Sequence, residues 1–403
     1  MEKIKLGFIG LGQRGNGWLG FILNEWKDDI DVVAVCDSYA DRTETAVNDV
    51  KKIRGFNAVG YTDADKLLQD KNVDAVIISA AWEAHVPLAV KSMEAGKITA
   101  LEVGGAYSID DCRLLVRTYE KTKTPFFFME NCCYGKRELL ATGMARKGLL
   151  GEIVYCHGAY CHDLREEISY GVKNRHYRLR NYLTRNCDNY PTHELGPIAK
   201  LLNINRGNRM VSLVSVSSKA RGLEEYVNGR DDLASLKGKR FMQGDIVHTI
   251  IKCADGAIIS LKLDTTLPHP YSREFTVEGT KGMYSERGDV ALIAGEFDHE
   301  KDICEYFGTA KKHEDCMPKL WRNMTKEQID AGHGGMDYLL LKAFVDAVKN
   351  GDEMPIDVYD AASWMAITCL SEDSIANGGA PVAIPDFTDG KWVMREKKDV
   401  TEF

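Results

Sequence analysis

A glycine-rich turn that joins an apolar run to a helical stretch constrains the fold of this chain more than any other feature. Residues 4–9 (IKLGFI) are apolar, residues 10–15 follow the spacing G-x-G-x-x-G, and residues 31–36 form a second apolar run that ends at Asp37. In such a unit the glycines allow a tight turn, close approach of a pyrophosphate to the backbone, and close packing of helix on strand. This order predicts a dinucleotide-binding βαβ unit, whose glycines are Gly10, Gly12 and Gly15.

Asp37 indicates which dinucleotide the unit binds. An acidic residue about 20 residues after the first glycines hydrogen-bonds the adenine ribose, and its carboxylate repels a 2′-phosphate. Arg42 is a signal for NADP, because an arginine near this position accommodates a 2′-phosphate. We give it less weight because it lies several residues into the next helical stretch. The sequence therefore predicts NAD rather than NADP.

The alternation of strands and helices continues to about residue 130. Residues 73–79, 98–102 and 125–129 read as buried strands, and residues 84–95 and 108–121 read as helices, the second opened by Ser108 as N-cap. Alternating strands and helices predict a doubly wound parallel sheet, whose ligands lie beyond the carboxyl ends of the strands. The residues expected on that edge are 10–14, Asp37, 79–85, Glu102 and 130–131.

The second half of the chain has longer strands separated by turns. The predicted strands are residues 152–160, 210–218, 246–253, 257–263 and 274–278, and the predicted helices are 337–349 and 358–376. Residues 221–245 read as an excursion, and residues 285–332 have no clear periodicity. We expect an NAD-binding Rossmann domain at 1–131 and an α+β domain with an open, mostly antiparallel sheet at 132–403, whose C-terminal helices are free to pack back on the first domain.

Composition excludes several classes of protein. The net charge is −8 without a long block of one sign, which argues against nucleic-acid binding. The sequence contains no run of 18 apolar residues, so no membrane-spanning helix is predicted. The start of the sequence resembles no export signal. We therefore expect a cytoplasmic protein. The eleven cysteines contain no C-x-x-C pair and are expected to be reduced thiols.

Tyrosine, histidine and arginine gather in the middle of the chain. Tyr160 and His162 lie close together, Arg178 follows, and residues 190–194 (YPTHE) and 268–271 (PHPY) add more. Imidazole and phenol groups move protons and guanidinium groups orient oxygens, which suits a hydroxylated ligand. Taken singly, each such residue is more often structural than catalytic. The spacing of His157, His162, Asp163 and His193 fits no helical ligand motif, so no metal is predicted.

These residues lie in motifs of a known family. The architecture resembles the Gfo/Idh/MocA oxidoreductases, and more narrowly the chain resembles glycoside hydrolase family 109, NAD-dependent glycosidases with α-N-acetylgalactosaminidase activity. The matching stretches span nearly the whole chain. They are residues 82–88 (WEAHVPL), 102–103, 129–134 (MENCCY), 146–152 (RKGLLGE), 158–165 (GAYCHDLR), 190–197 (YPTHELGP), 203–209 (NINRGNR), 269–272 (HPYS), 332–337 (GHGGMD) and 384–388 (IPDFT).

The resemblance implies roles for individual residues. Those implied to hold the cofactor, beside the three glycines, are Gln13, Arg14, Asp37, Trp82, Glu83, His85, Glu102, Val103 and Asn131. Those implied to contact the sugar are Tyr160, Arg178, Tyr190, His193 and Tyr271, with His162 and Glu130 as further candidates. We expect Tyr160, Tyr190 and His193 to share the proton transfers. The resemblance also implies a dimer or tetramer.

The sequence departs from its relatives at two places. The sugar dehydrogenases of the superfamily carry Glu-Lys-Pro, with an acid–base lysine, where this chain has Glu102, Val103 and Gly104. The glycosidase branch also lacks the lysine but usually has proline and alanine where Gly104 and Gly105 stand. The stretch between Arg165 and Arg178 is shorter than in the characterised glycosidases, which leaves the choice of sugar open.

The resemblance implies a redox-assisted hydrolysis. The sugar is oxidised at C3, a base removes the C2 proton, the C1 substituent is eliminated, water adds, and the hydride returns. An NAD-dependent sugar or polyol dehydrogenase that releases the ketone is one alternative, and the missing lysine argues against it. A non-catalytic NAD-binding sensor is the other, and the proton-transfer residues argue against that.

Overall fold

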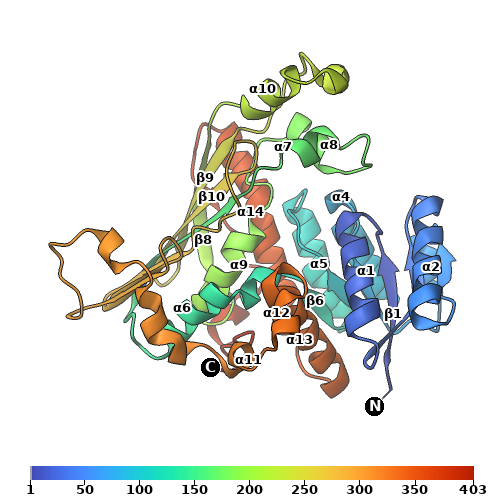
Figure 1. Ribbon diagram of the computed structural model, residues 1–403, viewed down its shortest axis with the longest axis horizontal. Helices are drawn as coiled ribbons and strands as arrows, with labels where there is room; N and C mark the ends of the chain where they lie inside the picture. Colours follow the sequence, from blue (N-terminus) through green and yellow to red (C-terminus); the bar gives the residue numbers. More distant parts are fainter. Residues whose placement is uncertain (1) are drawn as a thin grey trace. The chain divides into compact units, whose positions relative to one another are not determined.

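The computed structural model describes residues 2–403 and divides into two compact units (Figure 1). The first unit contains the described residues up to Glu130 together with Ile329–Ala362. The second contains Asn131–Gln328 and Ser363–Phe403. Each unit is built on its own β-sheet. Within residues 2–403, no helix has the length and apolar character needed to cross a membrane.

The first unit has a parallel sheet in the strand order β3-β2-β1-β4-β5-β6. The strands are β1 (Ile4–Ile9), β2 (Ile30–Cys36), β3 (Val59–Tyr61), β4 (Ala75–Ile78), β5 (Ile98–Leu101) and β6 (Phe126–Phe128). The chain order reverses between β1 and β4, which makes the topological switch point of a doubly wound fold. The predicted Rossmann fold is therefore confirmed.

Helices connect these strands. They are α1 (Gln13–Glu25), α2 (Ala40–Arg54), α3 (Ala64–Gln69), α4 (Trp82–Glu94) and α5 (Ile109–Thr122). The predicted N-cap of α5 is confirmed, because the Ser108 hydroxyl accepts a hydrogen bond from the Asp111 N–H at 3.0 Å. The later helix α13 (Met336–Asn350) also belongs to this unit and stacks Phe344 on Phe127 of β6, with 5.8 Å between ring centroids.

The second unit has a mixed sheet in the order β13-β12-β11-β7-β10-β9-β8-β14. Its strands are β7 (Ile153–Cys161), β8 (Met210–Ser217), β9 (Ile246–Cys253), β10 (Ile258–Asp264), β11 (Thr276–Gly279), β12 (Gly282–Ser285), β13 (Val290–Ile293) and β14 (Val382–Ala383). Among the described strands, β7 and β10 run parallel and the other pairs are antiparallel. The predicted open, mostly antiparallel sheet is confirmed.

Helices of the second unit position its polar residues. They are α6 (Lys136–Arg146), α7 (Arg165–Ser169), α8 (Arg178–Thr184), α9 (Thr192–Leu201) and α10 (Gly222–Asn228). Helix α9 lies directly on β7, since a Cβ atom at Gly158 would be 2.9 Å from the Glu194 Cβ. The last long helix, α14 (Val358–Ala376), begins in the first unit and ends in the second.

The structure resolves the stretch that the sequence left unassigned. Residues 285–332 form β13, several 3-10 turns and the short helices α11 (Lys319–Arg322) and α12 (Lys326–Asp330). Strands β3, β12, β13 and β14 were not predicted from sequence. Each has two to four residues, too few for an alternating pattern to become visible.

Candidate functional site

The glycine turn of the first unit has the shape that a dinucleotide requires. Gly10 has a φ of +94°, and a Cβ there would lie 2.5 Å from the Ser79 carbonyl group. A Cβ at Gly15 would lie 2.0 Å from the Gly10 carbonyl oxygen. At Gly12 the nearest atom to such a Cβ is the Arg42 guanidinium, at 3.8 Å. The turn is thus closed at its first and third glycines and open at the second, where pyrophosphate approaches in this fold.

The turn leads directly into α1. Gly12 is the N-cap of this helix and offers no side chain to its first N–H groups. The first N–H groups of any helix lack intrahelical partners and carry the positive end of the helix dipole. Together with the open face at Gly12, they form an anion-binding site of the kind that holds phosphates.

Asp37 lies beside this turn, as the sequence predicted. It is buried, and its Oδ2 accepts a hydrogen bond from the Leu11 N–H at 2.8 Å, while its Oδ1 accepts one from the Tyr39 N–H at 2.9 Å. The Arg42 guanidinium reaches back to 3.7 Å from Asp37 Oδ2 and lies 4.9 Å from the centre of the Tyr39 ring. Arg42 therefore lies next to Asp37, although it is several residues along the chain and inside α2.

The side chain of Arg14 is bound by two carboxylates. Its Nε donates to Glu102 Oε1 at 2.8 Å, and its terminal nitrogens donate to the two oxygens of Asp337 at 2.8 and 3.0 Å. Trp18 Nε1 also donates to Glu102 Oε1, at 2.6 Å. Burial opposes the charge of Arg14, but Glu102 and Asp337 hold its pKa above the ordinary value. The Arg14 guanidinium is therefore held in place by residues of the same unit.

Asp337 and His333 were not predicted from the sequence as site residues. His333 Nδ1 lies 2.8 Å from Asp337 Oδ2 and 3.2 Å from Arg14 Nη1. His333 has a φ of +45° within a run of positive-φ glycines. Burial would raise the pKa of Asp337, but hydrogen bonds from His333 and Arg14 lower it well below its ordinary value. The motif GHGGMD was the available signal, but His333 and Asp337 are 319 and 323 residues from Arg14, so no local pattern showed the contact.

His85 and Trp82 form the start of α4. His85 is fully buried, and its Nε2 donates to the Ala80 carbonyl at 3.0 Å, because a carbonyl oxygen only accepts. Its Nδ1 has no hydrogen-bond partner among residues 2–403. Burial lowers the pKa of His85 to about 4, against the opposing effect of Glu102. The imidazole is therefore neutral at pH 7 and presents a buried acceptor.

The remaining predicted cofactor residues occupy the same carboxyl edge of the parallel sheet or follow it. Val103 is the second residue after β5, and its N–H donates to Glu102 Oε2 at 2.9 Å. Glu83 lies in the first turn of α4, and Gln13 begins α1. Glu130, a candidate for sugar contact rather than for the cofactor, is buried just beyond β6. Asn131 begins a 3-10 helix of the second unit.

These features fit bound NAD. The glycine cradle and the start of α1 suit the pyrophosphate, the Asp37 carboxylate suits the ribose, and the neutral His85 leaves a buried nitrogen without a partner among the described residues. Bound NAD would supply reversible hydride transfer; the chain would supply its position.

The second unit brings the predicted sugar-contacting rings together. Ring centroids lie 4.9 Å apart for Tyr160 and Tyr190, 4.7 Å for Tyr190 and His193, and 5.5 Å for Tyr160 and His193. His162 and Tyr271 join the cluster, 5.4 Å from each other and 6.2 and 6.1 Å from Tyr160. They come from β7, the start of α9, and the loop after β10.

Two arginines fix this aromatic cluster. Arg178 is buried, with its guanidinium 4.9 Å from the centre of the Tyr190 ring and its Nε 2.8 Å from Glu167 Oε1. Arg273, which the sequence argument did not name, donates to the Tyr271 hydroxyl at 2.9 Å and to Glu138 at 2.6 Å. Glu138 is buried on α6, more than a hundred residues away in sequence, so no local pattern revealed this pair.

Burial favours the neutral forms of three groups of the cluster, Tyr160, Tyr271 and His162. Burial raises the pKa of Tyr160 well above the ordinary value, although the charge of Arg178 opposes this. Burial likewise raises the pKa of Tyr271 and lowers that of His162. Neutral phenols donate hydrogen bonds, and a neutral imidazole accepts a proton. The cluster is therefore suited to bind hydroxyl groups and move protons.

The four residues considered as metal ligands from sequence have separate partners. Asp163 is held by Arg165, with 2.6 Å between Nη2 and Oδ2, and His157 Nε2 lies 3.3 Å from Glu274 Oε2. His162 and His193 belong to the aromatic cluster.

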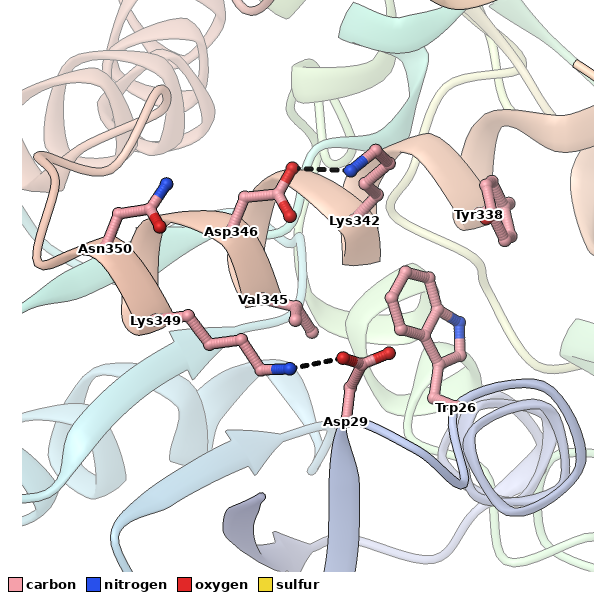
Figure 2. Close-up of a pocket in the computed structure, with 8 residues that line it drawn as sticks. All are labelled: Trp26, Asp29, Tyr338, Lys342, Val345, Asp346, Lys349 and Asn350. Carbon is pink, nitrogen blue, oxygen red and sulfur yellow. Dashed lines mark hydrogen bonds and ion pairs between the residues drawn. The ribbon is translucent and has the colours of Figure 1, made fainter. Parts of the chain in front are cut away.

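A surface pocket of about 330 Å³ lies elsewhere in the first unit (Figure 2). It is lined by Trp26, Asp29, Tyr338, Lys342, Val345, Asp346, Lys349 and Asn350. Lys342 pairs with Asp346, and Lys349 with Asp29, as the dashed lines of Figure 2 show. Trp26 follows the C-terminal end of α1, whereas the glycine turn precedes its N-terminal end. A 13-residue helix is about 20 Å long, so this pocket is not the nucleotide site.

Comparison with known proteins agrees with this geometry. Residues 134–394 match the family model "Glycosyl hydrolase 109, C-terminal domain", and residues 4–129 match "Oxidoreductase family, NAD-binding Rossmann fold". The chain is 37% identical to an α-N-acetylgalactosaminidase from Tannerella forsythia, over 98% of this chain and 88% of that protein. It is 36% identical to the protein of that name from Shewanella oneidensis, over 97% and 86%.

Solved structures show the same fold at low sequence identity. Levoglucosan dehydrogenase in complex with NADH has a TM-score of 0.70 at 16% identity, covering 96% of this chain and 100% of that one. An oxidoreductase from Agrobacterium radiobacter in complex with NAD⁺ and L-tartaric acid has a TM-score of 0.66 at 16% identity, covering 95% and 99%. These solved structures show the fold, whereas the two family models and the relatives at 36–37% identity show the family: the chain belongs to glycosyl hydrolase family 109 and carries the NAD-binding Rossmann fold of the Gfo/Idh/MocA oxidoreductases.

Proposed function

We propose that this protein is an NAD-dependent glycosidase that acts on a small glycoside of the N-acetylgalactosaminide class. The observation that carries the proposal is the cluster of Tyr160, Tyr190 and His193, with ring centroids 4.7 to 5.5 Å apart, in a chain that also contains an intact dinucleotide cradle. The names of two relatives at 36–37% identity support the choice of sugar. The reaction proposed is transient oxidation at C3, elimination across C1 and C2, and addition of water.

In this proposal the aromatic cluster handles protons. Tyr190 and His193 move the protons at the C3 hydroxyl and at C2, and Tyr160 donates a hydrogen bond or a further proton. A positioned acid–base group typically contributes about 10²–10⁴-fold to the rate. Arg178, fixed by Glu167, orients a sugar oxygen. Tyr271 and His162 complete the sugar contacts, and Glu130 is a further candidate.

The first unit has the cofactor-binding role in this proposal. The backbone of Gly10, Gly12, Gln13, Arg14 and Gly15 holds the pyrophosphate, and Asp37 holds the ribose. The residues proposed for the nicotinamide side are Trp82, Glu83, His85, Glu102, Val103 and Asn131. We keep the functional boundary proposed from sequence, residues 1–131 and 132–403, in which the C-terminal helices are free to pack back on the first domain; α13 lies in the first compact unit.

We also propose a homo-oligomer in the cytoplasm. Val216, Ile250 and Ile258 are 44–55% exposed, and the strand register places them on one face of the second sheet. A shared apolar face of this kind often mediates subunit contact. None of the eleven cysteines, all within residues 2–403, is in a disulfide, which suits a reducing compartment. Light scattering on the purified protein tests the first point: a monomer would refute it. Cell fractionation tests the second.

A two-channel assay tests the proposed reaction. Purified protein with NAD⁺ and a panel of p-nitrophenyl glycosides, N-acetylgalactosaminides included, should release nitrophenol without net NADH. Accumulation of NADH without nitrophenol would identify a dehydrogenase instead. Binding of NAD⁺ and glycoside with neither signal would indicate a sensor.

Variants then test the proton-transfer residues. Tyr190→Phe and His193→Ala should each lower turnover at least 100-fold. Tyr306→Phe is the matched control, because Tyr306 is remote from the cluster and bonds the Asp298 carbonyl at 2.8 Å. Undiminished turnover in either site variant would refute its role.

A further inference from the structure

Cys161, Asp264 and His269 of the second unit lie within reach of a single ion. One ligand atom from each lies within 4.8 Å of the other two. Glu274 borders the group: its Oε1 is 3.7 Å from Cys161 Sγ and 3.7 Å from His269 Nε2. Sulfur, imidazole nitrogen and carboxylate oxygen are the donors that zinc takes in proteins.

The backbone holds these residues in place. Cys161 and Asp264 end two neighbouring parallel strands, β7 and β10, and are partners in the register, so their side chains share one face. Cys161 exchanges two backbone hydrogen bonds of 3.0 Å with Ser272, and the Asp163 N–H donates to the His269 carbonyl at 3.0 Å. The ligand set is therefore built on paired strands and a tied loop.

Two further observations point to a ligand at this place. Asp264 is 96% buried, and its Oδ1 has no hydrogen-bond partner among residues 2–403, an unfavourable arrangement for a carboxylate. His269 Nδ1 lies 2.7 Å from the Pro270 carbonyl oxygen and must donate its hydrogen there. Its Nε2 therefore carries the lone pair and faces the cluster, as in histidines that bind metals.

We propose that Cys161, Asp264 and His269, with Glu274 as fourth ligand, form a site for one divalent transition-metal ion of the zinc class. Zinc–ligand bonds of about 2.0–2.3 Å give ligand–ligand separations of roughly 3.3–3.8 Å in a tetrahedron. His269 and Glu274 are partly exposed and supply both the entry path and the small closing movement. None of these four ligands is a residue proposed for the glycosidase reaction.

The charges of the site balance when the ion binds. Cys161 releases its proton to solvent, and the thiolate sulfur binds the ion. The three negative charges of two carboxylates and one thiolate then offset the two positive charges of the ion and the single positive charge of Lys262. The Lys262 Nζ is 3.0 Å from Glu274 Oε1. Lys262 competes with the ion for Glu274, so its removal should tighten binding. The bound ion would also anchor the loop that carries Tyr271.

Cobalt titration of the full-length protein, after treatment with a chelator, tests the site. We expect one equivalent of Co²⁺ to bind with a thiolate-to-cobalt charge-transfer band, and one equivalent of Zn²⁺ to displace it. Cys161→Ser and His269→Ala should abolish the band, whereas Lys262→Met should tighten binding about tenfold. Cys304→Ser and His299→Ala are the matched controls, since both side chains are exposed in the same unit.

The proposal fails if no thiolate band forms, if Cys161→Ser and His269→Ala bind cobalt as the wild type does, or if Lys262→Met weakens binding. His269→Ala keeps the test valid where Cys161→Ser does not fold, because His269 is partly exposed. Circular dichroism of the metal-free variants checks that each is folded.

Discussion

At the scale of single residues, Gly104 leaves room for the Trp82 indole of the proposed cofactor site. A Cβ at this position would lie 2.5 Å from Cδ1 and 2.9 Å from Nε1 of the Trp82 indole, a rigid ring that would have to turn away. Gly104→Ala should therefore displace Trp82 and raise the dissociation constant for NADH roughly tenfold, about 1.4 kcal/mol. Fluorescence titration with NADH measures the change.

Gly17→Ala is the matched control for that prediction. No atom lies within 4 Å of a Cβ at Gly17, which is exposed on α1, and alanine favours a helix. The control should bind NADH as the wild type does. Equal affinity for Gly104→Ala would show that Trp82 does not line the cofactor site.

Replacing Arg178 by lysine tests whether the aromatic cluster needs a planar cation. Its guanidinium forms an ion pair with Glu167 and lies over the Tyr190 ring at the same time. Lysine keeps the positive charge but lacks the planar guanidinium, which can contact a carboxylate and lie on a ring at once. Arg178→Lys should lower kcat/KM for the cleaved glycoside by roughly 10- to 100-fold, about 1.4–2.7 kcal/mol. Arg180→Lys, at an exposed position of the same helix, should change kcat/KM less than twofold.

At the scale of elements, one buried carboxylate joins α13 to α1. Asp337 of α13 is buried and holds Arg14 of α1 by two hydrogen bonds. Asp337→Asn keeps the shape but removes the charge, and should lower the free energy of unfolding by roughly 2 kcal/mol. Asp346→Asn removes an exposed pair on the same helix and should cost less than about 0.5 kcal/mol. Urea unfolding compares the two; equal losses would contradict this account.

The elements that sequence predicted are those whose pattern is local. Strand β4 (AVII) is buried along its whole length and reads as one apolar run, and α5 begins at a recognisable cap. Strand β3 has three residues that are exposed or half-exposed, so it carries no apolar signal. Strand β14 has two residues, and it is defined by its antiparallel pairing with β8 rather than by a pattern of its own.

The same distinction applies to the candidate sites. The glycine turn and Asp37 were readable because their spacing is fixed within one βαβ unit. The pair of Arg273 and Glu138 was not, because its partners are 135 positions apart. Such contacts depend on packing of elements that sequence alone does not place.

At the scale of the molecule, the buried His85 makes stability depend on pH. Its pKa falls from about 6.5 in the unfolded chain to about 4 in the folded state, so only the unfolded chain gains a proton between these values. Stability is fully present above pH 6.5 and is lost as pH falls toward 4, by up to roughly 3 kcal/mol. Urea unfolding at several pH values measures this loss.

His85→Gln should remove this component of the pH dependence, because glutamine does not titrate in this range. His299→Gln, at a side chain 84% exposed, should leave the wild-type profile unchanged. A His85→Gln protein that loses as much stability as the wild type between pH 6.5 and 4 would show that His85 is not the group responsible.

The central claim is that the glycosidic bond breaks by elimination after removal of the C2 proton. Turnover of a cleaved N-acetylgalactosaminide in D₂O, followed by mass spectrometry and proton NMR of the released sugar, tests it directly. If Tyr190 and His193 exchange the C2 proton with solvent during the reaction, the product carries one deuterium at C2. A product with the original hydrogen at C2, released at the normal rate, would contradict the account and indicate direct displacement at C1.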